Sequence, residues 1–155
     1  MDVPKLEDLG DLTGRRVLVR CDFNVPLADG VITDDLRIRA ALPTLRYLTD
    51  AGAHVTACSH LGRPVSSRDP TYAMKPIRAR LAELVHGVEL LENLRFDAGE
   101  TADDPVFVER LIEGQDAYVN DAFGASHRAH ASVVGPPRFL PSAAGRLLAR
   151  EVEVL

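Results

Sequence analysis

The amino-acid sequence predicts an α/β fold in which a parallel sheet lies between two layers of helices. Short β-branched, apolar runs alternate with longer segments of helical periodicity, which is typical of strands joined by helical crossovers. The composition, with 46% hydrophobic and 26% charged residues, is that of a globular protein. A chain of 155 residues can bury enough apolar surface to fold without disulfides or metal ions. We therefore expect one domain over residues 1–155.

Each expected strand is a short apolar run that ends in a polar loop. An Asp-Gly pair at Asp29 and Gly30 predicts a small hairpin in the loop after the first strand. The four expected strands are Arg16–Cys21, His54–Cys58, Val88–Leu91 and Asp116–Val119.

Helical spacing of apolar residues predicts the segments between the strands. In Thr33–Asp50, Pro43 interrupts the pattern and either kinks one helix or opens a second helix after a short first turn. We favour the second arrangement, because a proline at the first helical position has no N–H group to leave unpaired. The remaining expected helices are Lys75–Val85, Val106–Ile112 and Ser142–Leu155.

Charge and cysteine usage exclude several classes of protein. The formal net charge of -5 argues against a general electrostatic attraction to nucleic acid or to an anionic membrane. The chain has no run of 18 apolar residues and its amino terminus does not resemble a signal peptide. Cys21 and Cys58 lie far apart and indicate reduced, buried thiols. We expect a cytoplasmic protein that binds neither nucleic acid nor membrane.

Polar side chains follow all four expected strands. The carboxyl ends of parallel strands lie at one edge of a sheet, where ligands bind in this fold class, so these side chains should converge. Arg37, at the start of the first helix, lies above the same edge. The residues of the four loops are Asp22, Asn24, His60, Arg63, Glu92, Asn93, Arg95, Asn120, Asp121, His127 and Arg128.

This set of side chains suits a small, multiply charged anion that also carries a hydroxyl group. Guanidinium groups bind phosphate and carboxylate oxygens through two parallel hydrogen bonds, and Asp22 could accept a hydrogen bond from a hydroxyl. A hydroxylated phospho-acid is a ligand that matches this set of side chains. The alternative remains that Asp22 and Asn24 are turn residues and that the arginines are solvated surface charges. Codon bias in a GC-rich genome would then account for the number of arginines. His127, His130 and Asp121 match no metal-binding pattern, so no metal site is expected.

Neither common nucleotide-phosphate motif is present in the sequence. It contains no G-x-x-x-x-G-K-[ST] and no G-x-G-x-x-G, and no lysine lies near the four loops. A hydrolase triad is not indicated either, because Ser59 and Ser126 adjoin histidines without a G-x-S-x-G turn.

Five segments carry a resemblance to a known family. VRCDFNVPL, DDLRIRAALPT, SHLGRP, LLENLRF and VNDAFGASHRAHAS occur in this order between Arg16 and Gly135. Together they resemble the amino-terminal half of phosphoglycerate kinase. The resemblance implies a Rossmann-like three-layer fold, with helices on both faces of a parallel sheet, and a domain that binds 3-phosphoglycerate or 1,3-bisphosphoglycerate. The family's glycolytic reaction transfers a phosphoryl group reversibly between MgATP and 3-phosphoglycerate.

The resemblance also implies roles for individual residues. Asp22 and Asn24 would contact the hydroxyl and carboxylate region of the glycerate. Arg37 would be catalytic as well as substrate-binding, because its counterpart is held to move onto the transferring phosphoryl group. The basic patch of the family would comprise Arg37, His60, Arg63, Arg95 and Arg128.

Two departures from the family pattern are visible. A strand and part of a helix would be missing between Leu84 and Gly87, which would leave the sheet one strand short. The carboxyl-terminal half, which holds MgATP or MgADP in the family, has no counterpart in these 155 residues. We therefore expect the chain alone to bind no cofactor, to contact ATP only through that missing half, and to be inactive. The alternative is a non-catalytic phosphoglycerate-binding or interaction domain left by truncation.

Overall fold

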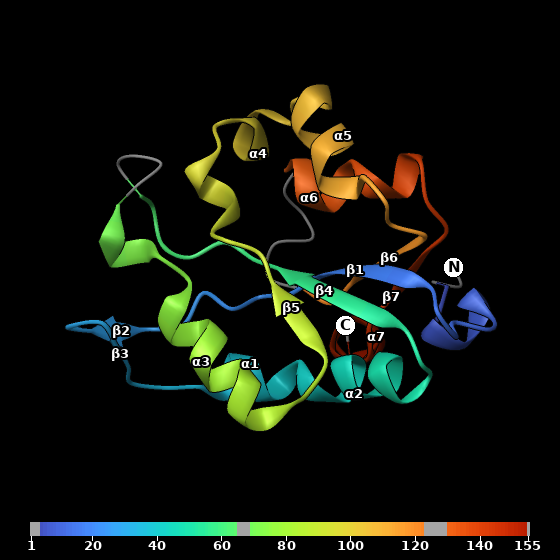
Figure 1. Cartoon of the computed structure of the whole chain (residues 1–155), viewed down its shortest axis with the longest axis horizontal. Helices are drawn as coiled ribbons and strands as arrows, with labels where there is room; N and C mark the ends of the chain where they lie inside the picture. Colours follow the sequence, from blue (N-terminus) through green and yellow to red (C-terminus); the bar gives the residue numbers. More distant parts are fainter. Residues whose placement is uncertain (1–3, 65–68, 123–129, 155) are drawn as a thin grey trace.

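A parallel sheet of five strands runs through the centre of the molecule in a computed structural model that describes residues 4–64, 69–122 and 130–154 (Figure 1). All four neighbouring strand pairs are parallel. The strand order is β5-β4-β1-β6-β7. The bounds are Arg16–Arg20 for β1, His54–Cys58 for β4, Val88–Leu90 for β5, Ala117–Asn120 for β6 and Ser142–Ala144 for β7.

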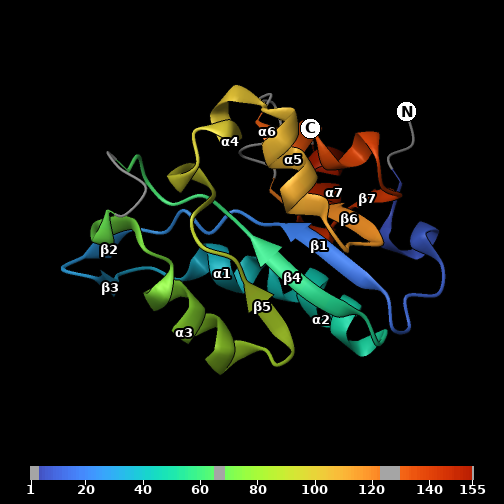
Figure 2. The same ribbon diagram turned by 45° about the horizontal axis from the view of Figure 1, so that its top comes forward.

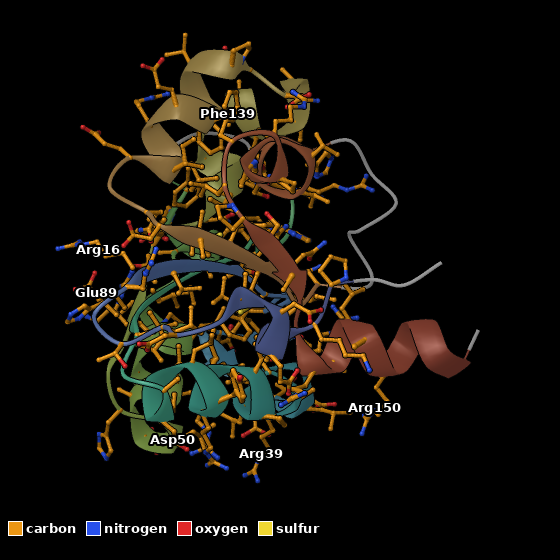
Figure 3. The ribbon with its side chains drawn as sticks, turned by 90° about the vertical axis from the view of Figure 1, so that its right-hand side faces the viewer. Arg16, Arg39, Asp50, Glu89, Phe139 and Arg150 are labelled. Carbon is orange, nitrogen blue, oxygen red and sulfur yellow. The ribbon has the colours of Figure 1, made fainter. Side chains whose placement is uncertain are left out.

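Helices cover both faces of the sheet, as predicted. One face carries α1 (Leu36–Ala40), α2 (Leu42–Asp50), α3 (Lys75–Leu84) and α7 (Arg146–Val154) (Figures 1 and 2). The other face carries α4 (Gly99–Ala102), α5 (Pro105–Ile112) and α6 (Ala131–Val134). Figure 3 shows Asp50 and Phe139 at opposite ends of this stack of layers. Short 3-10 turns occupy Leu6–Leu9 (η1), Pro70–Tyr72 (η2), Leu94–Phe96 (η3) and Pro136–Arg138 (η5).

The two faces of the sheet form separate apolar cores. Val17 and Val19 of β1 pack into the cluster that α2 and α3 complete. Leu18, between them, belongs to the second cluster with Phe107 and Tyr118. Successive side chains of a strand point to opposite faces, so a strand covered on both sides is apolar at consecutive positions, here Val17–Val19. This requirement explains the continuous apolar run of the first strand.

The local signals in the first third of the chain are confirmed. Strands β2 (Leu27–Ala28) and β3 (Val31–Ile32) form the expected antiparallel hairpin. Asp29 and Gly30 both have positive φ, 51° and 77°, as a tight two-residue turn requires. Pro43 lies in the first turn of α2, which follows α1 directly, so the favoured reading of this proline is correct.

The expected helix Ser142–Leu155 is wrong at its beginning. Ser142–Ala144 is strand β7, which pairs with Tyr118–Asn120 of β6, and helix α7 begins at Arg146. Ser-Ala-Ala contains no β-branched or aromatic residue, so nothing local indicates a strand. The neighbouring strand β6 supplies the hydrogen bonds that determine its conformation. Helices α4 and α6 lie in segments for which the sequence predicted no helix.

The shortened segment is closed without a gap in the sheet. Helix α3 ends at Leu84, β5 begins at Val88, and β5 pairs directly with β4. At the opposite edge, Lys5 forms a parallel bridge with Ala144 of β7. Within the described residues, β5 is therefore the outer strand that no further segment covers. None of the helices in the described residues is long and apolar enough to cross a membrane.

Candidate functional site

The loop after β1 brings three of the predicted residues together. Arg37 Nη1 donates to the carbonyl oxygen of Asn24 at 2.7 Å and lies 3.4 Å from Asp22 Oδ1. The backbone N–H of Asn24 also donates to Asp22 Oδ1, at 3.2 Å. About half of the Arg37 side chain is exposed (53%). Helix α1 thus presents a guanidinium group beside a carboxylate at the carboxyl edge of the sheet.

Hydrogen bonds join this loop to the loop after β4. Gly62 N donates to Asn24 Oδ1 at 2.9 Å, and Phe23 N donates to Ser59 Oγ at 2.9 Å. The Asn24 side chain therefore holds two loops together, which agrees with the structural role left open for it. Gly62 has a φ of 58°, and a Cβ there would lie 2.1 Å from the Tyr72 ring. Only glycine fits this crossing point.

Asn93, after β5, holds the third loop against the second. Its Oδ1 accepts from Leu61 N at 3.1 Å and from Arg95 N at 3.0 Å. Its Nδ2 donates to the carbonyl oxygens of Leu61 and Tyr72. Arg95 Nη1 donates to the carbonyl oxygen of Gly62 at 3.0 Å. Because Asn93 is buried, these bonds form in a low dielectric and hold the loop firmly.

His60 is largely buried and contacts a charged side chain that the sequence did not indicate as part of the site. Its Nδ1 lies 2.7 Å from Nη2 of Arg20, a strand residue with no exposed surface. Arg20 Nε donates to Ser132 Oγ at 2.8 Å, and Nη2 lies 3.9 Å from Glu100 Oε2. Ser132 and Glu100 belong to α6 and α4, so this network crosses from the site to the opposite helical layer.

A second buried carboxylate, Asp121, ends β6 and caps helix α7. Its Oδ1 accepts from the backbone N–H groups of Leu147 at 3.0 Å and Leu148 at 3.4 Å. Burial raises the pKa of Asp121 to about 7, although the hydrogen bonds that it accepts act in the opposite direction. A Cβ at Gly145 would lie 2.2 Å from Asp121 Oδ1, so the close approach requires glycine.

The predicted site residues are brought together only in part. Asp22, Asn24 and Arg37 lie in one group, and Arg95 reaches the loop that carries His60 and the exposed Arg63. A pocket of about 430 Å³ adjoins Arg37. Its lining includes Asn24 and Arg37 but not His60, Arg63 or Arg95. A single concavity shared by all of them stays a prediction. Arg128, like His127, lies outside the described residues.

No group of three or more His, Cys, Asp or Glu side chains in the described ranges could hold a metal ion. Besides the Asp22 carboxylate, the polar side chains near this edge are guanidinium, imidazole and amide groups, a set that suits an anionic ligand better than a cation.

Comparisons with known proteins agree with the resemblance. The family model of phosphoglycerate kinase matches residues 6–90 and 85–155. The phosphoglycerate kinase of Rubrobacter xylanophilus is 49% identical and aligns with 100% of this chain and 45% of its own length. That of Salinispora arenicola is 50% identical and aligns with 100% of this chain and 47% of its own length. The chain thus spans about half the length of these relatives.

A solved structure shares the fold as well as the sequence. The phosphoglycerate kinase of Coxiella burnetii superposes with a TM-score of 0.92 at 33% identity, over 98% of this chain and 44% of that one.

The alignment with the Rubrobacter protein extends over 178 residues, so that relative has residues that this chain of 155 lacks. The two matched segments of the family model meet and overlap at residues 85–90, which comprise the connection after α3 and strand β5. This position agrees with the expected shortening.

Proposed function

This chain belongs to the phosphoglycerate kinase family, and we propose that it is the half of such a kinase that binds 3-phosphoglycerate or 1,3-bisphosphoglycerate. The observation that carries the proposal is the grouping of Asp22, Asn24 and Arg37 at the carboxyl edge of the sheet, joined by Gly62 to the loop of His60 and Arg63. In the whole enzyme, a phosphoryl group would pass reversibly between MgATP and 3-phosphoglycerate, giving ADP and 1,3-bisphosphoglycerate.

The chemistry of the grouped side chains matches this substrate. Arginine side chains recognise phosphate and carboxylate through paired, charge-assisted hydrogen bonds. Asp22 is only about one-fifth exposed and supplies the acceptor that a glycerate hydroxyl requires. Arg63, Arg95 and Arg128 would hold the 3-phosphate and orient the carboxylate.

Arg37 is the proposed catalytic residue. Loose phosphoryl transfer is catalysed mainly by positioning and by stabilisation of charge on the transferring group. The ion pair of Arg37 with Asp22 is half exposed, and such pairs contribute only about 0–1 kcal/mol. The guanidinium group can therefore leave Asp22 for a phosphoryl oxygen at small cost.

A direct titration tests the binding proposal. Isothermal calorimetry with 3-phosphoglycerate should show weak binding to the wild type and a loss of about tenfold or more in Arg37→Ala and Arg63→Ala, because each removes a charge-assisted contact. Arg39→Ala is the matched control, since Arg39 lies on the same helix but pairs with Asp35 through an exposed ion pair. Unchanged affinity in both test variants would overturn these roles.

We further propose that the 155-residue chain alone turns over no ATP. MgATP or MgADP would be bound by the nucleotide half of the family, and losing both positioning and charge stabilisation removes many orders of magnitude in rate. A coupled kinase assay should therefore show activity only when a separately purified nucleotide-binding half of a relative is added. Turnover by the isolated chain above background would contradict this.

A further inference from the structure

We propose that Arg20 is a positioning residue that holds His60 as a neutral imidazole with its single proton on Nε2. The relevance to 3-phosphoglycerate rests on the proposed function, but the state of the ring rests on the fold alone. Arg20 lies in β1 and has no exposed surface, so it does not reach a ligand itself.

The tautomer follows from the contact of the ring with Arg20. Arg20 Nη2 lies 2.7 Å from His60 Nδ1. A guanidinium group has five N–H donors, no acceptor, and does not lose its proton in proteins. The imidazole nitrogen that faces it must therefore be the acceptor, with an unshared electron pair. A neutral imidazole then carries its proton on the other nitrogen, Nε2.

Arg20 is held in this orientation on its other sides. Nε donates to Ser132 Oγ at 2.8 Å, and Nη1 donates to the carbonyl oxygen of Cys21. Glu100 Oε2 faces Nη2 at 3.9 Å and supplies the compensating charge. Glu100 is anchored in turn, because its carboxylate accepts from Ser132 N at 2.8 Å and from Ser132 Oγ at 2.5 Å. The planar guanidinium group of Arg20 therefore cannot rotate away without leaving several buried polar groups without hydrogen bonds.

The same geometry opposes protonation of His60. An imidazolium ion would place an N–H at Nδ1 against the N–H of Arg20 and add a second positive charge beside it. Glu100 already balances the charge of Arg20 and is fully buried with it. His60 is only 8% exposed, so little water is available to screen the repulsion.

The consequence for the proposed site is a division of roles. The His60 ring then has one donor, Nε2–H, and carries no charge. The positive charge of the proposed patch then comes from its arginines. Glutamine places an amide donor near the position of Nε2–H, so it should substitute for His60 better than leucine does.

Nitrogen NMR on the wild type tests the inference without any ligand. In a long-range 1H–15N spectrum of histidine-labelled protein, we expect His60 to show a bare Nδ1 and a protonated Nε2 from about pH 5.5 to 8. His54 and His86 are exposed and serve as internal references for the ring signals of solvent-accessible histidines. A His60→Gln sample identifies the signals of His60. A proton on Nδ1, or the gain of a second ring proton by His60 in this pH range, would overturn the proposal.

The role of Arg20 is tested by Arg20→Lys, whose shorter donor group cannot reach Nδ1 in the same geometry. If the variant folds, the fixed tautomer of His60 should be lost, with protons exchanging between Nδ1 and Nε2, and an unchanged spectrum would contradict the proposal. If it does not fold, the wild-type spectrum decides.

Ligand binding supplies an independent readout. In calorimetry, His60→Leu should weaken 3-phosphoglycerate binding at least tenfold, while His60→Gln should retain most of the affinity and the wild-type salt dependence. A salt dependence reduced equally in both variants would show that His60 acts as a cation. If 3-phosphoglycerate does not bind at all, the proposed function fails, and the NMR result still decides the tautomer.

Discussion

Asp121 accepts the first backbone N–H groups of α7 from the end of β6, and it does so almost without contact with water. Its Oδ2 has no hydrogen-bond partner among the residues that the structure describes. A carboxylate in this position costs free energy when it is charged, because burial removes its hydration. The folded protein therefore holds the proton of Asp121 more tightly than the unfolded chain does.

This difference predicts a pH dependence of stability. Because the pKa of Asp121 is raised from 3.8 to about 7, its contribution to the free energy of unfolding is complete below about pH 4 and is lost as the pH rises through 7. The shift corresponds to roughly 4 kcal/mol. Thermal melts of Asp121→Asn should depend less on pH between about 4 and 8 than those of the wild type. Asp50→Asn, at an exposed carboxylate, is the control. Equal slopes in Asp121→Asn and the wild type would contradict the assignment.

At the scale of elements, the loops of the proposed site depend on a close crossing at Gly62. Its N–H donates to Asn24 and its carbonyl oxygen accepts from Arg95, so one residue connects the loops after β1, β4 and β5. The positive φ and the Tyr72 ring both act against any larger residue there. The positions of Arg63 and Arg95 thus depend on a residue that carries no side chain.

Two alanine variants separate the effect of backbone strain from that of the close contact. Gly30 has a φ of 77°, and a Cβ added there would meet no other atom within 4 Å. The Gly30→Ala protein should therefore lose only about 1 kcal/mol of unfolding free energy, from backbone strain. Gly62→Ala bears a similar strain and must also displace the Tyr72 ring. We expect it to lose roughly 3 kcal/mol or more in urea unfolding and to bind 3-phosphoglycerate more weakly. Equal losses in the two variants would show that the crossing is not tight.

At the scale of the whole molecule, the sheet has one edge that the rest of the described chain leaves uncovered. Strand β5 pairs with β4 on one side only, whereas the bridge of Lys5 with Ala144 covers part of β7. Unpaired edge strands are templates for association between chains, and charged side chains on them oppose it. Glu89, exposed in the middle of β5, is such a charge (Figure 3).

We therefore expect marginal stability and weak self-association that depends on Glu89. Sedimentation velocity over a concentration series should show more association in Glu89→Val than in the wild type, while Glu89→Lys keeps a charge at the edge and should not. A single monomer boundary for all three proteins, with a sharp melt at high temperature, would mean that the open edge at β5 is fully compensated.

Much of this fold was predictable because its signals are local. The apolar run of β1 indicates a strand covered on both faces, Asp29 and Gly30 specify a tight turn, and Pro43 specifies a helix start. The convergence of Asp22, Asn24 and Arg37 follows from a rule about the ends of parallel strands. Each inference needs only neighbouring residues, or one general property of the fold class.

The tertiary structure alone decided the rest. Ser142–Ala144 is a strand because β6 lies beside it, and Asp121 became a helix cap because α7 begins next to the end of β6. Arg20 and Ser132 are 112 positions apart in the chain, and nothing in their sequence neighbourhoods indicates a contact. A buried polar group is determined by the partner that compensates its lost hydration. That partner is determined only when the elements pack against each other. The periodicity and spacing of residues along the chain therefore do not indicate it.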